Sequence, residues 1–179
     1  QIIIPTGGGK TMCMIDDAMN EFSRTVSSQT IVVVAPRILL ANQLSAEFLY
    51  HNLDGAAESN ATINVMHVHS GETHHFSTTK VDEIRQFNYD TACDQKHLLI
   101  FTTYHSLHKI QESNIVVDTI YFDEAHNSVQ KNFFPATEHF SHFAERCYYF
   151  TATPKHSRTP SKAGMNWPEY GQVICQVPA

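Results

Sequence analysis

Short runs of consecutive apolar residues recur along the chain, and longer segments of helical or polar character separate them. The clearest run is 31–35, Ile-Val-Val-Val-Ala, in which β-branched residues follow one another without a polar break. Such a run is typical of a strand that is buried on both faces of a parallel sheet. Further strands are predicted at 2–4, 63–68, 98–101, 119–122 and 147–150, and 171–177 is either a last strand or the start of a linker.

Helical spacing of apolar residues is clearest directly after the first strand, at Met12, Ile15, Ala18, Met19 and Phe22. This spacing predicts an amphipathic helix from residue 10 to about residue 24. Further helices are predicted at 38 to about 51, 81 to about 89, and 133 to 145, with loops at 53–60 and 155–170. Strands that alternate with helices predict an α/β fold with a mainly parallel sheet and right-handed crossovers. Ligands of such sheets bind at the carboxyl ends of the strands.

The segment 5–11 reads Pro-Thr-Gly-Gly-Gly-Lys-Thr and lies between a predicted strand and a predicted helix. This is the context of a phosphate-binding P-loop, whose glycines allow backbone N–H groups to approach an anion closely. Ile4 stands where the strict pattern has a glycine, so the loop is a variant, and the alternative is a glycine-rich hairpin with a chance lysine. We expect the nucleotide phosphates to be bound by Thr6, Gly7, Gly8, Gly9, Lys10 and Thr11, with the Thr11 hydroxyl also a ligand of Mg²⁺.

Two acidic residues, Asp123 and Glu124, directly follow the apolar run 119–122. Hydrolysis of a phosphoanhydride needs a bound metal ion, neutralised charge and an oriented water molecule. We therefore expect Asp123 to hold Mg²⁺ and Glu124 to orient or deprotonate the attacking water. The alternative is a pair of acids that merely end a strand.

The composition is that of a globular protein, because 42% of the 179 residues are hydrophobic and 17% are charged. We expect one domain, 1–179, with no membrane-spanning segment and a cytoplasmic location. The widely spaced Cys13, Cys93, Cys147 and Cys175 are predicted to be buried reduced thiols. The net charge of −6 argues against a broad nucleic-acid-binding face, so such contacts would come from loops at strand ends or from a partner domain.

Four histidines, at positions 67, 69, 74 and 75, are close together in the sequence. Their spacing leaves two interpretations open, a metal site and a solvated histidine-rich loop. No cysteine lies nearby and the surrounding segment is polar, so we favour the solvated loop.

Four motifs stand in the order typical of one protein family: segment 5–11, segment 35–37 with Gln43, segment 123–126 (Asp-Glu-Ala-His) and segment 151–154 (Thr-Ala-Thr-Pro). In this order the chain resembles the first RecA-like domain of superfamily 2 helicases of the DEAD/DEAH type. The motif sequences are most similar to those of the branch that contains type I and III restriction translocases. The resemblance implies a three-layer P-loop NTPase fold, with ATP and Mg²⁺ as cofactors.

The same resemblance implies roles for individual residues. Lys10, Asp123 and Glu124 would be catalytic. Pro36, Arg37, Thr103 and Tyr104 would contact the nucleic-acid backbone, and His126, Thr151 and Thr153 would couple the nucleotide state to nucleic-acid binding. For Arg37 the alternative is an ordinary surface residue, and for Tyr104 and His105 it is plain packing.

The implied function is the ATP-binding half of a helicase or translocase that moves on or unwinds DNA or RNA with little sequence preference. An ATP-gated sensor or clamp on duplex nucleic acid is the alternative. We expect the chain to be a fragment that begins at the P-loop strand and binds and hydrolyses nucleotide weakly alone. Its partner in the parent protein would be a second RecA-like domain.

Overall fold

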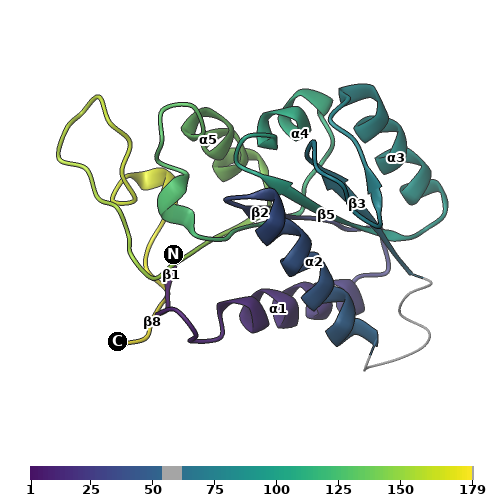
Figure 1. Cartoon of the computed structure of the whole chain (residues 1–179), viewed down its shortest axis with the longest axis horizontal. Helices are drawn as coiled ribbons and strands as arrows, with labels where there is room; N and C mark the ends of the chain where they lie inside the picture. Colours follow the sequence, from purple (N-terminus) through teal and green to yellow (C-terminus); the bar gives the residue numbers. More distant parts are fainter. Residues whose placement is uncertain (54–61, 179) are drawn as a thin grey trace.

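An eight-stranded sheet runs through the middle of the molecule, and helices cover both of its faces (Figure 1). The structure is a computed structural model that describes residues 1–53 and 62–178. The strand order is β4-β3-β5-β2-β6-β7-β1-β8, and every pairing is parallel. The strands are β1 (Ile2–Ile3), β2 (Thr30–Ala35), β3 (Ile63–Val68), β4 (Phe76–Ser77), β5 (His97–Thr103), β6 (Thr119–Phe122), β7 (Arg146–Thr151) and β8 (Cys175–Gln176).

The helices divide between the two faces of the sheet, with α1 and α2 on one side and α3, α4 and α5 on the other (Figure 1). Their bounds are α1 (Lys10–Arg24), α2 (Ile38–Leu53), α3 (Val81–Cys93), α4 (Leu107–Ser113) and α5 (Phe134–Phe143), with short 3-10 turns at η2 (Ala125–Asn127) and η3 (Pro168–Tyr170). This is the predicted three-layer arrangement. Among the described residues, no helix is long and apolar enough to cross a membrane.

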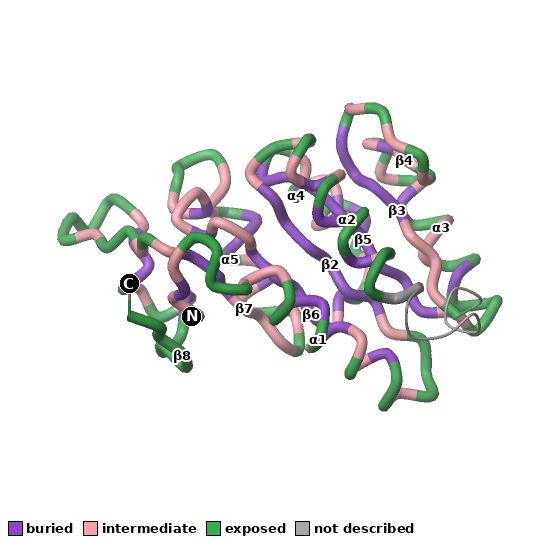
Figure 2. The backbone as a smooth tube through the Cα atoms, turned by 60° about the horizontal axis from the view of Figure 1, so that its bottom comes forward, coloured by how far each residue is buried: buried purple, intermediate pink, exposed green. Residues whose placement is uncertain are grey.

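Two hydrophobic cores lie on opposite sides of the sheet, and β2 contributes to both. Side chains of a strand alternate between faces, so Val32 and Val34 point into the core under α3, α4 and α5, whereas Ile31 and Val33 point into the core under α1 and α2. All six residues of β2 are buried, as predicted from its continuous apolar run. The central strands are accordingly buried along their length, whereas the outer sides of the helices are exposed (Figure 2).

The predicted strands and helices are confirmed, with differences at their edges. The structure adds α4 and the two-residue β4, neither of which was predicted, and it extends β5 to Thr103. The run 171–177 contains β8, which pairs with β1, so it is a strand and not a linker. Of the predicted loop 53–60, residue Leu53 ends α2 and the remainder lies outside the described residues.

The predicted burial of the cysteines is wrong for three of the four. Cys13, Cys93 and Cys175 are exposed, because they occupy the outer side of α1, the last residue of α3 and the edge strand β8. Cys147 is half-buried, and all four are free thiols. A cysteine at these three positions therefore does not contribute to either hydrophobic core.

The predicted solvated histidine loop is also wrong for its first two members. His67 is completely buried and His69 is 2% exposed, because both lie at the end of β3 beneath α2. The Gly71 backbone N–H donates to His69 Nδ1 at 3.1 Å, so the proton of that ring is on Nε2. His69 Nε2 then donates to His67 Nδ1, and His67 Nε2 donates to Ser45 Oγ, both at 3.0 Å. The chain of hydrogen bonds requires both rings to be neutral.

Candidate functional site

The P-loop joins β1 to α1, and its backbone conformation requires glycine at two positions. Gly7 and Gly9 have φ values of +79° and +90°, in the left-handed region that side chains disfavour. Gly9 immediately precedes Lys10, the first residue of α1. The glycines and Thr6 are exposed. The loop therefore presents exposed backbone at the positive end of a helix dipole, where an anion is stabilised.

Ile4, the residue that departs from the strict pattern, has a structural reason to be apolar. Its side chain is 3% exposed, and its backbone N–H donates to the Thr151 carbonyl at 3.0 Å, beside the pairing of β1 with β7. A Cβ at Gly8 would lie 2.4 Å from Ile4 Cγ2 and 2.9 Å from the Pro5 carbonyl oxygen. Gly8 is therefore required for the close approach of the loop to the strand residue beneath it.

The P-loop lysine is bound to the acidic residue that follows β6. Lys10 Nζ lies 2.5 Å from Glu124 Oε1, and the Lys10 side chain is only 11% exposed. Residues 10 and 124 are far apart in the sequence, so this ion pair brings together two motifs that were predicted separately. The pair neutralises the Glu124 carboxylate and keeps the Lys10 ammonium group between the P-loop helix and the acidic motif.

Asp123 lies at the end of β6, and its backbone N–H extends the sheet by donating to the Val34 carbonyl at 2.8 Å. Burial and the neighbouring Glu124 carboxylate raise the pKa of Asp123 to about 6, and Lys10 opposes this rise. A carboxylate in this setting is stabilised by a bound cation, because a cation favours the ionised form. Asp123 thus has the electrostatic properties of a metal ligand.

Glu124 also faces His126, which connects the acidic motif to the end of β7. His126 Nδ1 lies 3.6 Å from Glu124 Oε2 and 2.9 Å from the Thr151 hydroxyl oxygen. The same hydroxyl oxygen accepts a hydrogen bond from the Thr153 backbone N–H at 3.1 Å. Burial lowers the pKa of His126, while the Glu124 carboxylate acts in the opposite direction. A continuous series of polar contacts therefore runs from Lys10 to Thr153.

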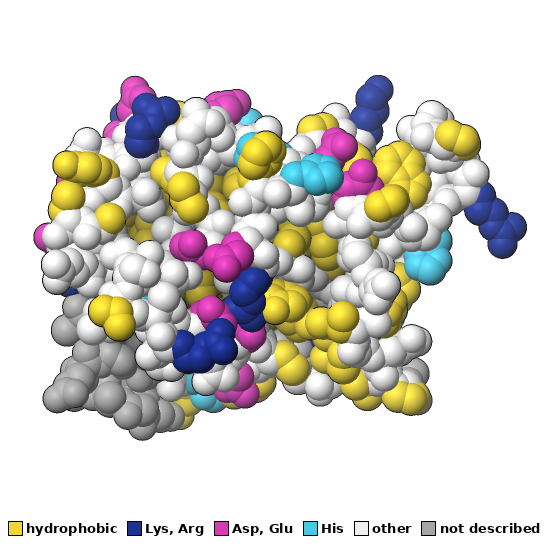
Figure 3. Space-filling view, turned by 180° about the vertical axis from the view of Figure 1, so that it is seen from behind, with side chains coloured by type: hydrophobic (Ala, Val, Ile, Leu, Met, Phe, Trp, Pro, Cys, Tyr) yellow, Lys and Arg dark blue, Asp and Glu magenta, His cyan; other side chains and the backbone are white. Residues whose placement is uncertain are grey.

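The predicted nucleic-acid contacts Pro36 and Arg37 lie on the same edge of the sheet, after β2. Arg37 is exposed and Pro36 is half-buried. Both line a hollow of about 440 Å³ together with Glu124 and His126, so the predicted nucleic-acid contacts lie beside the acidic motif. On the face shown in Figure 3, Lys and Arg side chains are scattered among Asp and Glu rather than gathered into one basic surface.

Tyr104 is placed in the core rather than at the surface, which favours the packing alternative over a nucleic-acid contact. It is 3% exposed, and its hydroxyl donates to the Asp123 carbonyl at 2.7 Å. Its ring lies between Phe122 and Phe133. Thr103 is likewise 3% exposed. Tyr104 therefore holds the backbone of the acidic motif in position.

Some residues of the site were not predicted from the sequence. Asn127 Nδ2 donates to the Glu124 carbonyl at 2.9 Å and so fixes the left-handed backbone of Glu124, whose φ is +48°. Gln130 lines the same hollow as Arg37, together with His105, which was weighed from the sequence as a packing residue and is exposed. The only sequence signal for Asn127 is that it directly follows the acidic motif, and Gln130 has no such signal.

Comparison with known proteins agrees with this geometry. Residues 1–156 match the family described as type III restriction enzyme, res subunit. No curated protein sequence matches the chain. Among solved structures, the chain is similar to a nuclease-deletion mutant of the Type ISP restriction-modification enzyme LlaGI in complex with a DNA substrate mimic, with a TM-score of 0.78 and 23% identity over 99% of this chain.

Two further structures share the fold. The ATP-dependent Type ISP restriction-modification enzyme LlaBIII bound to DNA has a TM-score of 0.71 and 20% identity over 98% of this chain. The yeast DEAD-box splicing factor Prp28 has a TM-score of 0.60 and 20% identity over 88% of this chain. The chain spans 18%, 13% and 37% of the lengths of these three proteins, respectively. It belongs to the type III restriction enzyme res subunit family, and its fold is that of the first RecA-like domain of superfamily 2 helicases.

Proposed function

We propose that residues 1–179 form the ATP-binding half of an ATP-dependent translocase or helicase that acts on DNA or RNA. One observation carries the proposal. The contacts of Lys10, Glu124, His126 and Thr151 join the P-loop, the acidic motif and the coupling motif at one edge of the sheet. A motor needs such a connection, because the nucleotide state has to change the grip on nucleic acid.

Magnesium fits the residues present. The Thr11 hydroxyl and the Asp123 carboxylate are oxygen donors of the kind that Mg²⁺ prefers, and the raised pKa of Asp123 shows that its charge lacks sufficient compensation in the protein alone. Thr11 and Asp123 would hold the ion. When bound with ATP, it would supply positive charge to the phosphate oxygens.

The ion pair of Lys10 with Glu124 suggests how the site responds to nucleotide. The terminal phosphates compete with Glu124 for the Lys10 ammonium group, since both are anionic and the loop glycines are open to solvent. Transfer of Lys10 to the phosphates frees the Glu124 carboxylate to orient or deprotonate the attacking water. The released carboxylate remains within reach of His126, so the change is passed toward Thr151.

Nucleic acid would be bound beside this network through Pro36 and Arg37, because Thr103 and Tyr104 are buried. These groups suit contact with phosphates, which supplies affinity without sequence preference. A second RecA-like domain of the same parent chain would complete the nucleotide cleft, and closure of that cleft would drive movement. LlaGI is in complex with a DNA substrate mimic and LlaBIII is bound to DNA, and these neighbours support a motor more than a sensor or clamp.

The first test is ATP·Mg²⁺ binding to this chain, measured by calorimetry. Lys10→Ala is expected to weaken binding at least about tenfold, because one charge-assisted contact to phosphate contributes about 1.5–3 kcal/mol. Asp123→Ala is expected to weaken the dependence of binding on Mg²⁺. Lys109→Ala is the matched control, since Lys109 lies on α4 and pairs only loosely with Glu112, at 3.9 Å.

Equal affinities for Lys10→Ala and Lys109→Ala would contradict the proposed nucleotide site. Strand displacement and ATP hydrolysis by the two-domain parent protein then separate the motor from the clamp. Hydrolysis stimulated by duplex, with neither strand separation nor movement along the duplex, would support the ATP-gated clamp.

A further inference from the structure

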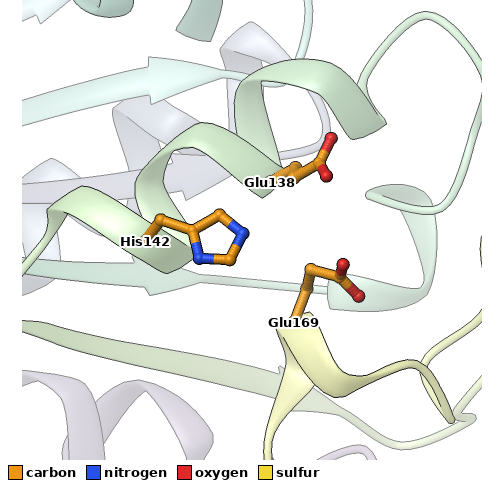
Figure 4. A group of neighbouring side chains, drawn as sticks. All are labelled: Glu138, His142 and Glu169. Atoms are coloured by element: carbon orange, nitrogen blue, oxygen red, sulfur yellow. The ribbon is translucent and has the colours of Figure 1, made fainter.

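Three side chains with metal-binding atoms converge on the side of the sheet that α5 covers, the opposite face from α1. Glu138 and His142 come from α5, and Glu169 comes from η3 (Figure 4). One possible ligand atom from each residue lies within 4.8 Å of those from the other two. Among the described residues, no other group of three or more His, Cys, Asp or Glu side chains has its possible ligand atoms within 4.8 Å of one another.

The backbone positions of the group are well defined. Glu138 and His142 are four residues apart on one helix, so both side chains project from the same face. The 3-10 turn that carries Glu169 is packed against α5, because Phe134 contacts both Trp167 and Tyr170. The Tyr149 hydroxyl also donates to the Glu169 carbonyl at 3.2 Å.

The charges of the group have no cationic partner in the described part of the chain. Neither Glu138 nor Glu169 forms an ion pair with lysine or arginine there. The Oε2 atom of Glu169 is buried and has no hydrogen-bond partner. A buried carboxylate oxygen without a partner is costly, and a second carboxylate nearby adds to that cost. A bound cation would remove both penalties.

We propose that Glu138, His142 and Glu169 bind a divalent transition-metal ion, with Zn²⁺ as the best-fitting member of that class. One imidazole nitrogen and two carboxylates suit Zn²⁺ better than Mg²⁺, which favours oxygen ligands alone. Ligand atoms bound to zinc at about 2.1 Å lie roughly 3.4 Å apart in a tetrahedron, so small side-chain rotations close the present spacing. Three protein ligands leave a fourth position for water.

This site is separate from the proposed Mg²⁺ site, which uses Thr11 and Asp123. Its effect would be structural, because an ion held by α5 and η3 links a helix to the segment that follows β7. Thr151 is the last residue of β7 and Thr153 lies in that segment, so the ion would hold in place the chain that continues from these two threonines. A ligand that binds only the folded state stabilises it in proportion to the logarithm of its concentration.

The test is calorimetric titration of this chain with Zn²⁺, together with thermal unfolding at increasing Zn²⁺. Wild type is expected to bind one ion at this site and to unfold at higher temperature as Zn²⁺ increases. Glu138→Gln and His142→Ala are expected to weaken that binding at least tenfold. Both positions are exposed, so the circular dichroism spectra of the metal-free variants should match that of wild type.

Binding by other histidines or by the exposed cysteines is the main competing explanation. His108→Ala, which removes another exposed helical histidine, is the matched control and should bind as wild type does. Substitution of Co²⁺ adds a spectroscopic measurement, because a thiolate ligand produces a charge-transfer band that carboxylates and imidazole lack. The proposal is overturned by a thiolate band, by unchanged affinity in Glu138→Gln, or by the absence of Zn²⁺ binding in wild type.

Discussion

His126 and His67 both connect elements through their ring nitrogens, but their surroundings differ in charge. The ring of His126 faces the Glu124 carboxylate and the Thr151 hydroxyl, and its side chain is 22% exposed. The ring of His67 is fully buried between His69 and Ser45. Burial lowers the pKa of both rings, but Glu124 opposes the effect at His126.

At His67 the neighbours add to the effect of burial. His69 and His75 disfavour a further positive charge, and together with burial they lower the pKa of His67 to about 3. The ring of His75 stacks on that of His67, with centroids 5.4 Å apart. The two histidines therefore differ in what opposes burial. At His126 a neighbouring carboxylate favours the protonated ring, whereas His67 is kept neutral as part of the core.

The largest expected difference between the two histidines is in stability. His67→Ala leaves a cavity and removes hydrogen bonds from Ser45 and His69, so we expect the free energy of unfolding to fall by about 2–4 kcal/mol. His126→Ala should lower it by less than about 1 kcal/mol, because that site is partly open to water. Urea unfolding of both variants checks this. Equal losses would show that the two environments do not differ as described.

The second expected difference is in pH dependence. Unfolded His67 takes up a proton below its ordinary pKa of 6.5, whereas folded His67 does so only near pH 3. Between these values the unfolded state binds more protons, so stability falls as the pH falls, by at most about 1.4 kcal/mol per pH unit from this group.

Urea unfolding between pH 7 and pH 4 measures this slope. The stability advantage of wild type over His67→Ala should shrink as the pH falls, because the variant lacks the titrating ring. His126→Ala should reduce the slope less than His67→Ala does, because Glu124 partly offsets the effect of burial on the pKa of His126. A constant difference between wild type and His67→Ala would argue that His67 is not held neutral.

A smaller effect than that of His67→Ala is expected at Thr151, the residue that His126 contacts. Thr151→Val removes the hydroxyl that pairs with His126 and accepts from the Thr153 N–H, so we expect a loss of about 0.5–1.5 kcal/mol. Thr151→Ser keeps the hydroxyl and should lose less. Thermal unfolding of the two variants provides the measurement, and a larger loss in Thr151→Ser would show that the methyl group of Thr151 contributes more than its hydroxyl.

Most of the sheet could be predicted from the sequence, because its strands are short apolar runs whose burial leaves a clear local signal. β2 illustrates this best. The two-residue β4 and the seven-residue α4 were missed, since elements of that length carry almost no periodicity. The motifs likewise identified Lys10 and Glu124, but the ion pair between them depends on how the strands are ordered in the sheet.

Burial of polar residues was the least predictable property. Tyr104 follows the predicted strand 98–101 and His67 lies inside the predicted strand 63–68, and each is buried because a tertiary partner satisfies its polar atoms. For Tyr104 the partner is the Asp123 carbonyl, and for His67 the partners come from α2 and the end of β3. Hydropathy along the chain contains no information about such partners.

The contact between Ile4 and Gly8 has a consequence for recognising relatives of this chain. A side chain at position 8 would meet the Pro5 carbonyl as well as Ile4, so shortening residue 4 would not permit anything larger than glycine there. Position 4, by contrast, needs only to fill an apolar space at the end of β1. Homologues should therefore vary among aliphatic residues at position 4 and stay invariant at position 8, and a search pattern that insists on glycine at position 4 would overlook them.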